Sequence, residues 1–300
     1  NSLNYLNIKY KYGLKKMYKL FNIPLKNPIG NAAGVLCYNH RDLNTMLHSN
    51  SGFIVTKSCT LNRRLGNATP RFWANNEISI NSMGLPNKGL NYYLSWIRKN
   101  GYKKPTILSI ANIDNDQTTK ILERIYPLDY IHLPEINVSC PNIIGKPQLA
   151  YDFEGLHDFL FFNMSKNYNK PYGLKLPPFF DPIHIEKLTE IIALFPMIKY
   201  ITCCNSIGNT LILDKNKNPV IKPKNGLGGL GGTFMKPIGL ANVYGFKKMF
   251  KEKSIDIDII GCGGIMNKVD VEEYISVGAS CVQVGTSLWN SGPKLIDTLI

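Results

Sequence analysis

The sequence lacks the cysteine and histidine spacings that hold metals or disulfides. Its seven cysteines are odd in number and form no C-x-x-C pair, and its five histidines form no H-x-x-x-H pair. Zinc sites and disulfide frameworks depend on such spacings. We therefore expect reduced thiols in a reducing compartment, which favours a cytoplasmic protein, and no metal held by the protein.

Membrane spans and a nicotinamide-binding motif are also absent. No apolar run is long enough to cross a bilayer, and no G-x-G-x-x-G opens a helix after the first expected strand. The second absence argues against a Rossmann nicotinamide site. No linker or block of charge marks a domain boundary. With 300 residues and 44% hydrophobic content, the chain can bury one large core.

Acidic residues are scarce, above all near the N-terminus. The chain has 35 Lys and Arg against 21 Asp and Glu, a formal net charge of +14, and no acidic residue before Asp42. This charge raises nucleic acid, an acidic membrane or an anionic substrate as partners. Because the lysines are scattered along the chain, we expect neither nucleic acid nor membrane. Residues 1–17 are expected to form a basic arm, for which anionic-polymer binding stays open, and residues 18–300 a single domain.

Short β-rich apolar runs alternate with helical segments that carry apolar residues at three-and-four spacing. The expected strands are residues 28–33, 53–56, 106–110, 130–138, 172–176, 199–203, 257–261 and 281–285. The expected helices are residues 42–48, 90–99, 116–125, 153–164, 184–195, 240–250 and 269–277. Eight strands separated by helices predict right-handed βαβ units in one parallel sheet. The fold class is therefore α/β, as a (β/α)8 TIM barrel.

Two polar insertions interrupt this alternation. Residues 60–83, after the second strand, are rich in Asn, Arg and small residues, and residues 210–224, after the sixth, indicate a polar hairpin. Both follow the C-terminal ends of strands, where a barrel carries its active site. We expect them to form walls or lids of a pocket at this mouth.

Amides and a thiol follow several of the expected strands. Cys140 lies between Asn137 and Asn142, while Asn81 and Asn205 follow other strand segments. A lone cysteine is most often a core residue and a lone asparagine a turn residue. Together, a thiol that can act as an acid or base and four carboxamides suit a flat heterocycle that alternates C=O and N–H groups.

Two lysines and three glycine-rich stretches complete this set. Lys57 and Lys175 stand in runs otherwise built for burial, where an amine needs an anion or an electron-rich ring as partner. The glycines of residues 226–232, 261–264 and 284–286 follow strands six, seven and eight, and in barrels the loops after strands seven and eight commonly form a phosphate cup. The residues predict a non-covalent FMN and an oxidoreductase with a cysteine base. A flavin- or phosphate-binding barrel without activity is the alternative.

These motifs resemble those of class 1A dihydroorotate dehydrogenases, the soluble flavin enzymes of pyrimidine synthesis. The resemblance runs in order from about Tyr18 to the C-terminus. It rests on residues 31–35, 56–58, 80–87, 137–142, 145–153, 175–178, 205–209, 221–224, 226–232, 261–265 and 285–286.

The resemblance implies a reaction and a partner set. Cys140 would take the proton from C5 of dihydroorotate while a hydride leaves C6 for flavin N5, and fumarate would reoxidise the flavin to give succinate. The chain would act as a homodimer. Class 2 enzymes, which reduce quinone, carry serine at the position of Cys140. A class 1B enzyme, which passes electrons to NAD through an iron–sulfur partner, remains the alternative.

The resemblance also implies site residues. Those expected to contact substrate are Lys57, Asn81, Met83, Gly84, Leu85, Asn137, Asn142, Asn205 and Ser206. Those expected to contact FMN are Ala32, Ala33, Gly34, Lys57, Ser58, Asn137, Lys175, Cys204, Gly231, Gly232, Cys262, Gly263, Gly264, Gly285 and Thr286. Residues 141–147 would form a lid that brings Cys140 into the site and excludes water.

The chain departs from the family pattern in three places. Residues 1–16 precede the matching part and have no assigned role. The sequence ends at Ile300, before the last helix that family members usually show, which leaves closure of the barrel open. Cys262 stands where threonine is usual, a change that alters packing beside the phosphate loop without removing a backbone donor.

Overall fold

The computed structural model of the chain describes residues 17–139, 148–164 and 170–300. Four parts of the sequence predictions fall outside the described residues. These are the catalytic Cys140, the substrate contact Asn142, the lid of residues 141–147 and residues 1–16 of the basic arm.

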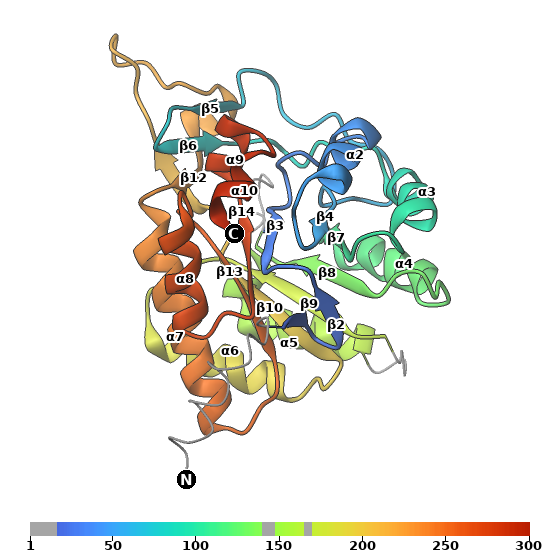
Figure 1. Cartoon of the computed structure of the whole chain (residues 1–300). Coiled ribbons are helices and arrows are strands. Elements are labelled where there is room, and N and C mark those ends of the chain that lie inside the picture. Colours follow the sequence, from blue (N-terminus) through green and yellow to red (C-terminus); the bar gives the residue numbers. More distant parts are fainter. Residues whose placement is uncertain (1–16, 140–147, 165–169) are drawn as a thin grey trace, which may run out of the picture.

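Eight parallel strands form one sheet that closes into a barrel (Figure 1). In spatial order they are β3 (Ile29–Asn31), β14 (Cys281–Val284), β13 (Asp258–Cys262), β10 (Ile198–Cys203), β9 (Tyr172–Leu176), β8 (Leu133–Asn137), β7 (Thr106–Ala111) and β4 (Ile54–Val55). Strands β3 and β4, the first and last in this order, are joined by a parallel bridge between Gly30 and Phe53, which closes the barrel. The Gly52 N–H also donates to the Ile29 carbonyl at 2.8 Å. The predicted (β/α)8 barrel is confirmed, and it closes within the chain that ends at Ile300.

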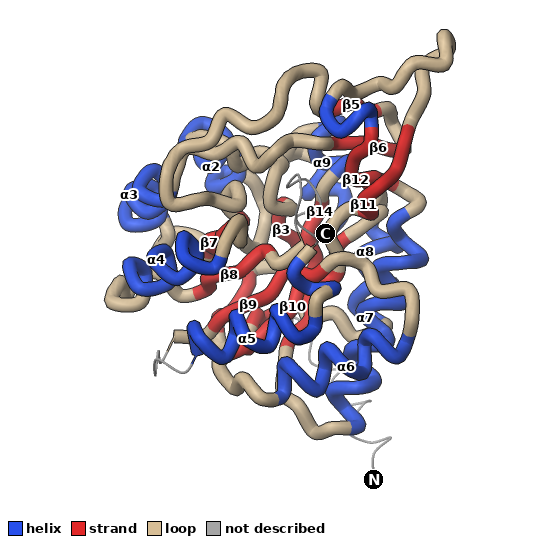
Figure 2. The backbone as a smooth tube through the Cα atoms, turned by 180° about the vertical axis from the view of Figure 1, so that it is seen from behind, coloured by secondary structure: helices blue, strands red, loops and turns tan. Residues whose placement is uncertain are grey.

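Helices surround the strands, as Figures 1 and 2 show from opposite sides. They are α2 (His40–His48), α3 (Leu90–Asn100), α4 (Asn115–Ile125), α5 (Phe153–Met164), α6 (Pro182–Ala193), α7 (Met235–Glu252), α8 (Lys268–Ser276), α9 (Thr286–Ser291) and α10 (Leu295–Leu299), with short 3-10 turns η1 (Leu149–Tyr151) and η2 (Pro223–Gly226). Their starts follow ordinary capping chemistry. The side chain of Asn39 caps α2, that of Asp114 caps α4, and Asn267 and Asp270 form a capping box at α8.

Helix α7 begins at Met235, five residues before the expected start. The expectation placed Pro237 outside the helix. Proline is tolerated in the first turn, however, because the first N–H groups of a helix have no intrahelical partner. Helices α9 and α10 were not expected. None of the helices within the described ranges combines the length and the apolar character needed to cross a bilayer.

A hairpin that the sequence did not indicate closes the N-terminal end of the barrel. Strands β1 (Tyr18–Leu20) and β2 (Ile23–Leu25) pair antiparallel. Leu20 and Leu25 pack in one cluster with buried residues of the barrel strands and their immediate neighbours. The other members are Phe53, Val55, Ile107, Leu133, Tyr200, Ile260 and Cys281. This end of the barrel is therefore a filled apolar core.

The two insertions meet in one four-stranded antiparallel sheet. Its order is β11 (Ile207–Leu211), β12 (Leu227–Gly232), β6 (Ile78–Asn81) and β5 (Phe72–Ala74). Figures 1 and 2 show β5, β6 and β12 at one end of the barrel, next to α9. This placement confirms that both insertions lie at the mouth. Phe72, Ser79, Asn81 and Met83 of the first insertion line the pocket there, whereas residues 210–224 of the second do not. The glycine-rich stretch expected after strand six forms strand β12, whose residues 229–232 pair with β6.

Candidate active site

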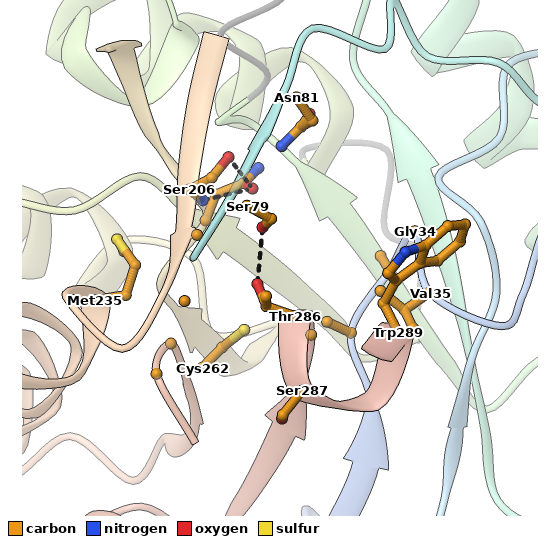
Figure 3. Close-up of a pocket in the computed structure, with 18 of the residues that line it drawn as sticks. Gly34, Val35, Ser79, Asn81, Ser206, Met235, Cys262, Thr286, Ser287 and Trp289 are labelled. Carbon is orange, nitrogen blue, oxygen red and sulfur yellow. Dashed lines mark hydrogen bonds between the residues drawn. The ribbon is translucent and has the colours of Figure 1, made fainter. Parts of the chain in front are cut away.

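A pocket lies between the C-terminal ends of the barrel strands and the four-stranded sheet (Figure 3). Its barrel side comes from the residues that follow β3, β4, β10, β13 and β14, together with Lys175 of β9. Its other side comes from β5, β6 and β12. Because parallel strands all end at one rim, residues far apart in sequence converge here.

Most of the residues predicted for the site line this one pocket. From the predicted flavin set these are Ala32, Ala33, Gly34, Lys57, Lys175, Cys204, Gly231, Gly232, Cys262, Gly263, Gly264, Gly285 and Thr286. From the predicted substrate set they are Lys57, Asn81, Met83, Asn205 and Ser206. The structure thus brings the predicted residues together, while their contacts with ligands remain predictions.

Four predicted residues in the described ranges do not line the pocket. Ser58 and Asn137 are buried and are not among its lining residues. The Ser58 hydroxyl lies 2.9 Å from that of Ser109, and the Asn137 amide donates to Ser58 at 3.4 Å. Leu85 packs in a small cluster with Ala111, and Gly84 is buried beside it.

An amide network fixes Ser139, the last described residue before Cys140. Oδ1 of Asn137 accepts from the Ser139 N–H at 3.1 Å and from its hydroxyl at 2.8 Å. Nδ2 of Asn205 donates to the Ser139 hydroxyl at 2.9 Å and to its carbonyl at 3.3 Å. The Ser206 N–H in turn donates to Oδ1 of Asn205 at 2.8 Å. Two strand ends therefore hold the backbone that leads into Cys140.

Two lysines bring positive charge to the pocket. Lys57 is 8% exposed and Lys175 is 3% exposed. The Lys175 amine donates to Oε1 of Gln283 at 2.9 Å. A side-chain carbon added to Gly34 would lie 3.3 Å from the Lys57 amine, so glycine at this position leaves room for the lysine head. Buried amines of this kind suit an anionic or electron-rich ligand.

Two thiols line the pocket, and both are unsuited to act as a base. Burial raises the pKa of Cys204, with a further increase from Cys262 and a partial offset by Lys175. Burial likewise raises the pKa of Cys262, against the lowering effect of Lys175. Both thiols are therefore neutral near neutral pH and serve as apolar wall.

Glycines and hydroxyls converge at one end of the pocket. The hydroxyls of Ser79 and Thr286 lie 2.8 Å apart, as the dashed line in Figure 3 shows. A side-chain carbon on Gly231 would lie 3.0 Å from the first and 3.1 Å from the second. Gly264 has φ +68, and a side-chain carbon there would lie 2.6 Å from the backbone nitrogen of Lys236. Only glycine allows the backbone to come this close, which fits a cradle for a phosphate.

Sequence reasoning missed several lining residues, namely Val35, Phe72, Ser79, Met235, Ile265, Met266, Ser287 and Trp289. Ser79 could have been found, because alternate residues of a strand share a face and Asn81 was already chosen. Trp289 and Phe72 could not have been found in this way. Their ring centroids lie 4.9 Å apart in an edge-to-face arrangement, which arises only because α9 packs beside the four-stranded sheet. Within the described ranges, no three His, Cys, Asp or Glu side chains group as metal ligands.

Comparison with known proteins gives a consistent picture. The family model for dihydroorotate dehydrogenase matches residues 16–300. A dihydroorotate dehydrogenase (fumarate) of Trypanosoma cruzi is 44% identical over 278 residues, which cover 91% of this chain and 87% of that protein. A putative dihydroorotate dehydrogenase A (fumarate) of Streptococcus agalactiae is 44% identical over 274 residues, which cover 90% of this chain and 86% of that protein.

Solved structures share the fold. A dihydroorotate dehydrogenase of Eimeria tenella in complex with ferulenol has a TM-score of 0.74 at 19% identity, covering 100% of this chain and 89% of that one. The ligand-free form from the same organism has a TM-score of 0.77 at 20% identity, covering 94% and 85%. At these identities the likeness shows the fold alone.

Proposed function

The chain belongs to the dihydroorotate dehydrogenase family, and from this we propose that it oxidises (S)-dihydroorotate to orotate with bound FMN and passes the electrons to fumarate. The observation that carries the proposal is the convergence of lysines, amides and glycines of the described residues on one pocket. The 44% identity to relatives named for fumarate supports the acceptor. Family members depend on a flavin, and FMN is the specific form that we propose.

The pocket residues fit FMN. The glycine cradle with Ser79 and Thr286 suits its phosphate, and the buried Lys175 amine suits the electron-rich ring of a reduced flavin. We assign the phosphate to Gly232, Gly263, Gly264, Gly285 and Thr286. We assign the ring to Ala32, Ala33, Lys57 and Lys175. When bound, the flavin supplies an acceptor for the hydride that leaves the substrate.

The chain's own residues would orient the substrate and move a proton. We propose that Asn81, Asn137, Asn142, Asn205 and Ser206 hold the orotate ring and carboxylate through their amides and hydroxyl, and that Lys57 offsets substrate charge. The network at Ser139 would fix the direction from which the Cys140 thiol arrives.

Cys140 is proposed as the base that takes the C5 proton. A thiol with an ordinary pKa of about 8.5 is a better base near neutral pH than a serine hydroxyl. Burial raises the pKa of Cys204 and Cys262, the two thiols that line the described part of the pocket. Because neither thiol suits the role of base, this supports assigning that role to Cys140.

The test is anaerobic mixing of the yellow protein with dihydroorotate, followed by separate additions of fumarate, NAD and a quinone. We expect the flavin absorbance to bleach with dihydroorotate and to recover with fumarate. Recovery with NAD through a partner alone would indicate a class 1B enzyme, and recovery with quinone alone a class 2 enzyme. A flavin that dihydroorotate does not bleach would leave a non-catalytic flavin-binding barrel.

We also propose a cytoplasmic homodimer, with residues 1–17 as a basic arm on a single barrel domain. Leu211 and Leu213 offer exposed apolar side chains near the β11–β12 connection, which supports a subunit contact on this face. Sedimentation equilibrium of the wild type and of Leu213→Asp tests it. A wild type that sediments as a monomer contradicts the proposed homodimer.

Unchanged heparin retention after deletion of residues 1–16 would exclude anionic-polymer binding by the arm.

A further inference from the structure

A layer of polar side chains lies inside the barrel below the pocket. Glu135 of β8, Thr202 of β10 and Gln283 of β14 have no exposed surface, and Lys175 of β9 is almost as deeply buried. Lys175 is the ladder partner of Asn137 and of Thr202. Because Glu135 precedes Asn137 by two residues, its side chain points to the same side of β8, one layer further from the mouth.

These side chains are connected to one another. The Lys175 amine donates to Oε1 of Gln283 at 2.9 Å, and the Thr202 hydroxyl donates to Oε2 of Glu135 at 2.6 Å. Oε1 of Glu135 and Nε2 of Gln283 have no hydrogen-bond partner in the part of the chain that the structure describes. The Gln283 amide is nevertheless close enough to the carboxyl to lower its pKa. Gln283 thus lies between the carboxyl and the amine.

Lys175 is the charge that Glu135 faces. Burial raises the pKa of Glu135, and Lys175 is the strongest of the groups that lower it. The other titratable neighbours are Tyr200, Cys262 and Cys281, and burial raises the pKa of each, so they are neutral near neutral pH. Among the described residues, Glu135 is the only Asp or Glu with no exposed surface. A buried carboxylate needs a counter-charge, and Lys175 supplies it from a position that also lines the pocket.

We propose that Glu135 is a positioning residue, which holds the Lys175 amine at the pocket through Gln283 and, when ionised, offsets part of the positive charge that Lys175 presents to the flavin. This inference rests on the proposed flavin site. A positive charge favours the negatively charged reduced form of a flavin, so Lys175 alone raises the reduction potential. An ionised Glu135 lowers it again.

The test is the midpoint potential of bound flavin in the wild type and in Glu135→Gln, measured from about pH 6 to about pH 10, a range that brackets documented buried carboxyls. The substitution removes the charge but keeps the shape and an acceptor for Thr202. Below the pKa of Glu135 both proteins carry a neutral group, so their potentials coincide. Above it only the wild type carries a carboxylate, so the Glu135→Gln potential is shifted upward. Identical potentials at every pH would overturn the proposal and leave Glu135 a structural residue.

A second pair of variants tests the route through Lys175. In a Lys175→Met background the carboxyl has lost its counter-charge, so its pKa rises further and Glu135→Gln shifts the potential less at a given pH. A shift of undiminished size in that background would overturn the route. If Glu135→Gln fails to fold, Thr202→Val replaces it. Loss of the hydroxyl that stabilises the carboxylate raises the pKa of Glu135 and moves the fall in potential to higher pH. An unchanged profile contradicts the proposal.

Failure of this inference can be told from failure of the proposed function. A wild type that binds no flavin, or whose flavin dihydroorotate does not reduce, contradicts the proposed function. A wild type that is reduced normally, with potentials insensitive to residue 135, contradicts only the role of Glu135.

Discussion

The two ends of the barrel use the same eight strands and differ in what those strands carry. At the N-terminal end, the β1–β2 hairpin seals a cluster that includes Leu20, Phe53 and Tyr200, with apolar side chains throughout. At the C-terminal end, the strands finish in amides, lysines and glycines, and a second sheet stands over them. The N-terminal end is filled by its own side chains, whereas the C-terminal end leaves a pocket lined by two buried lysines and by glycines that let the backbone come close. Substitutions at the two ends should therefore separate stability from function.

The largest effect is expected at the mouth, for Cys140→Ser. Replacing the general base should slow flavin reduction by dihydroorotate by about 10²- to 10⁴-fold. The loss should shrink as pH rises, because a hydroxyl gains basic character only at high pH. Stopped-flow reduction across pH measures this. Cys281→Ala, which removes a thiol at the closed end, is the matched control and should retain the wild-type rate. Equal rates for wild type and Cys140→Ser would remove Cys140 from the mechanism.

At the closed end, Leu20→Ala should lower the free energy of unfolding by about 2–5 kcal/mol through a cavity in the apolar cluster. Because the pocket lies at the opposite rim, the protein that remains folded should bind FMN with unchanged affinity. Urea unfolding and flavin titration measure the two quantities separately. A weakened flavin affinity without loss of stability would contradict the division between the two ends.

At the mouth, Gly264→Ala can be compared with Gly292→Ala, a control outside the pocket lining, to separate close approach from backbone strain. Both glycines have positive φ, +68 and +71, so each substitution strains the backbone by about 1–3 kcal/mol. A side-chain carbon at Gly264 would collide with the Lys236 backbone, whereas none of the described atoms lies within 4 Å of one at Gly292. We expect FMN affinity to fall about tenfold for Gly264→Ala only, equivalent to about 1.4 kcal/mol. Equal affinities in the two variants would argue against a phosphate cradle at Gly264.

The smallest effect is expected for Ser139→Ala. The hydroxyl donates to Asn137 and accepts from Asn205, and each such hydrogen bond contributes about 0.5–1.5 kcal/mol. Looser amides should raise the KM for dihydroorotate severalfold and leave FMN affinity unchanged. Steady-state kinetics and flavin titration check this. A changed FMN affinity with an unchanged KM would place the network on the cofactor instead.

Much of the architecture followed from the sequence, because burial periodicity is a local signal. The alternation of strand and helix patterns predicted the barrel and its eight strands, and the structure confirms them. The residues at the strand ends predicted that Lys57, Lys175 and Asn205 gather at one rim, where all three line the pocket. The antiparallel pairing of β12 with β6 was not predicted. It joins residues 229–232 to residues 78–81, and nothing within either stretch specifies the other.

The sequence by itself determined which residue types stand at each strand end, and a parallel barrel then leaves them only one rim to share. Only the tertiary structure decided which of them face the pocket. Ser58 and Asn137 do not line it, whereas Ser79 and Trp289 do. It also placed Glu135 beneath Lys175, inside a strand whose pattern indicated burial alone. The physical reason is that the pattern of apolar residues along one strand is enough to predict its burial. The partner of a buried charge, in contrast, comes from another strand, and only the closed barrel brings the two strands together.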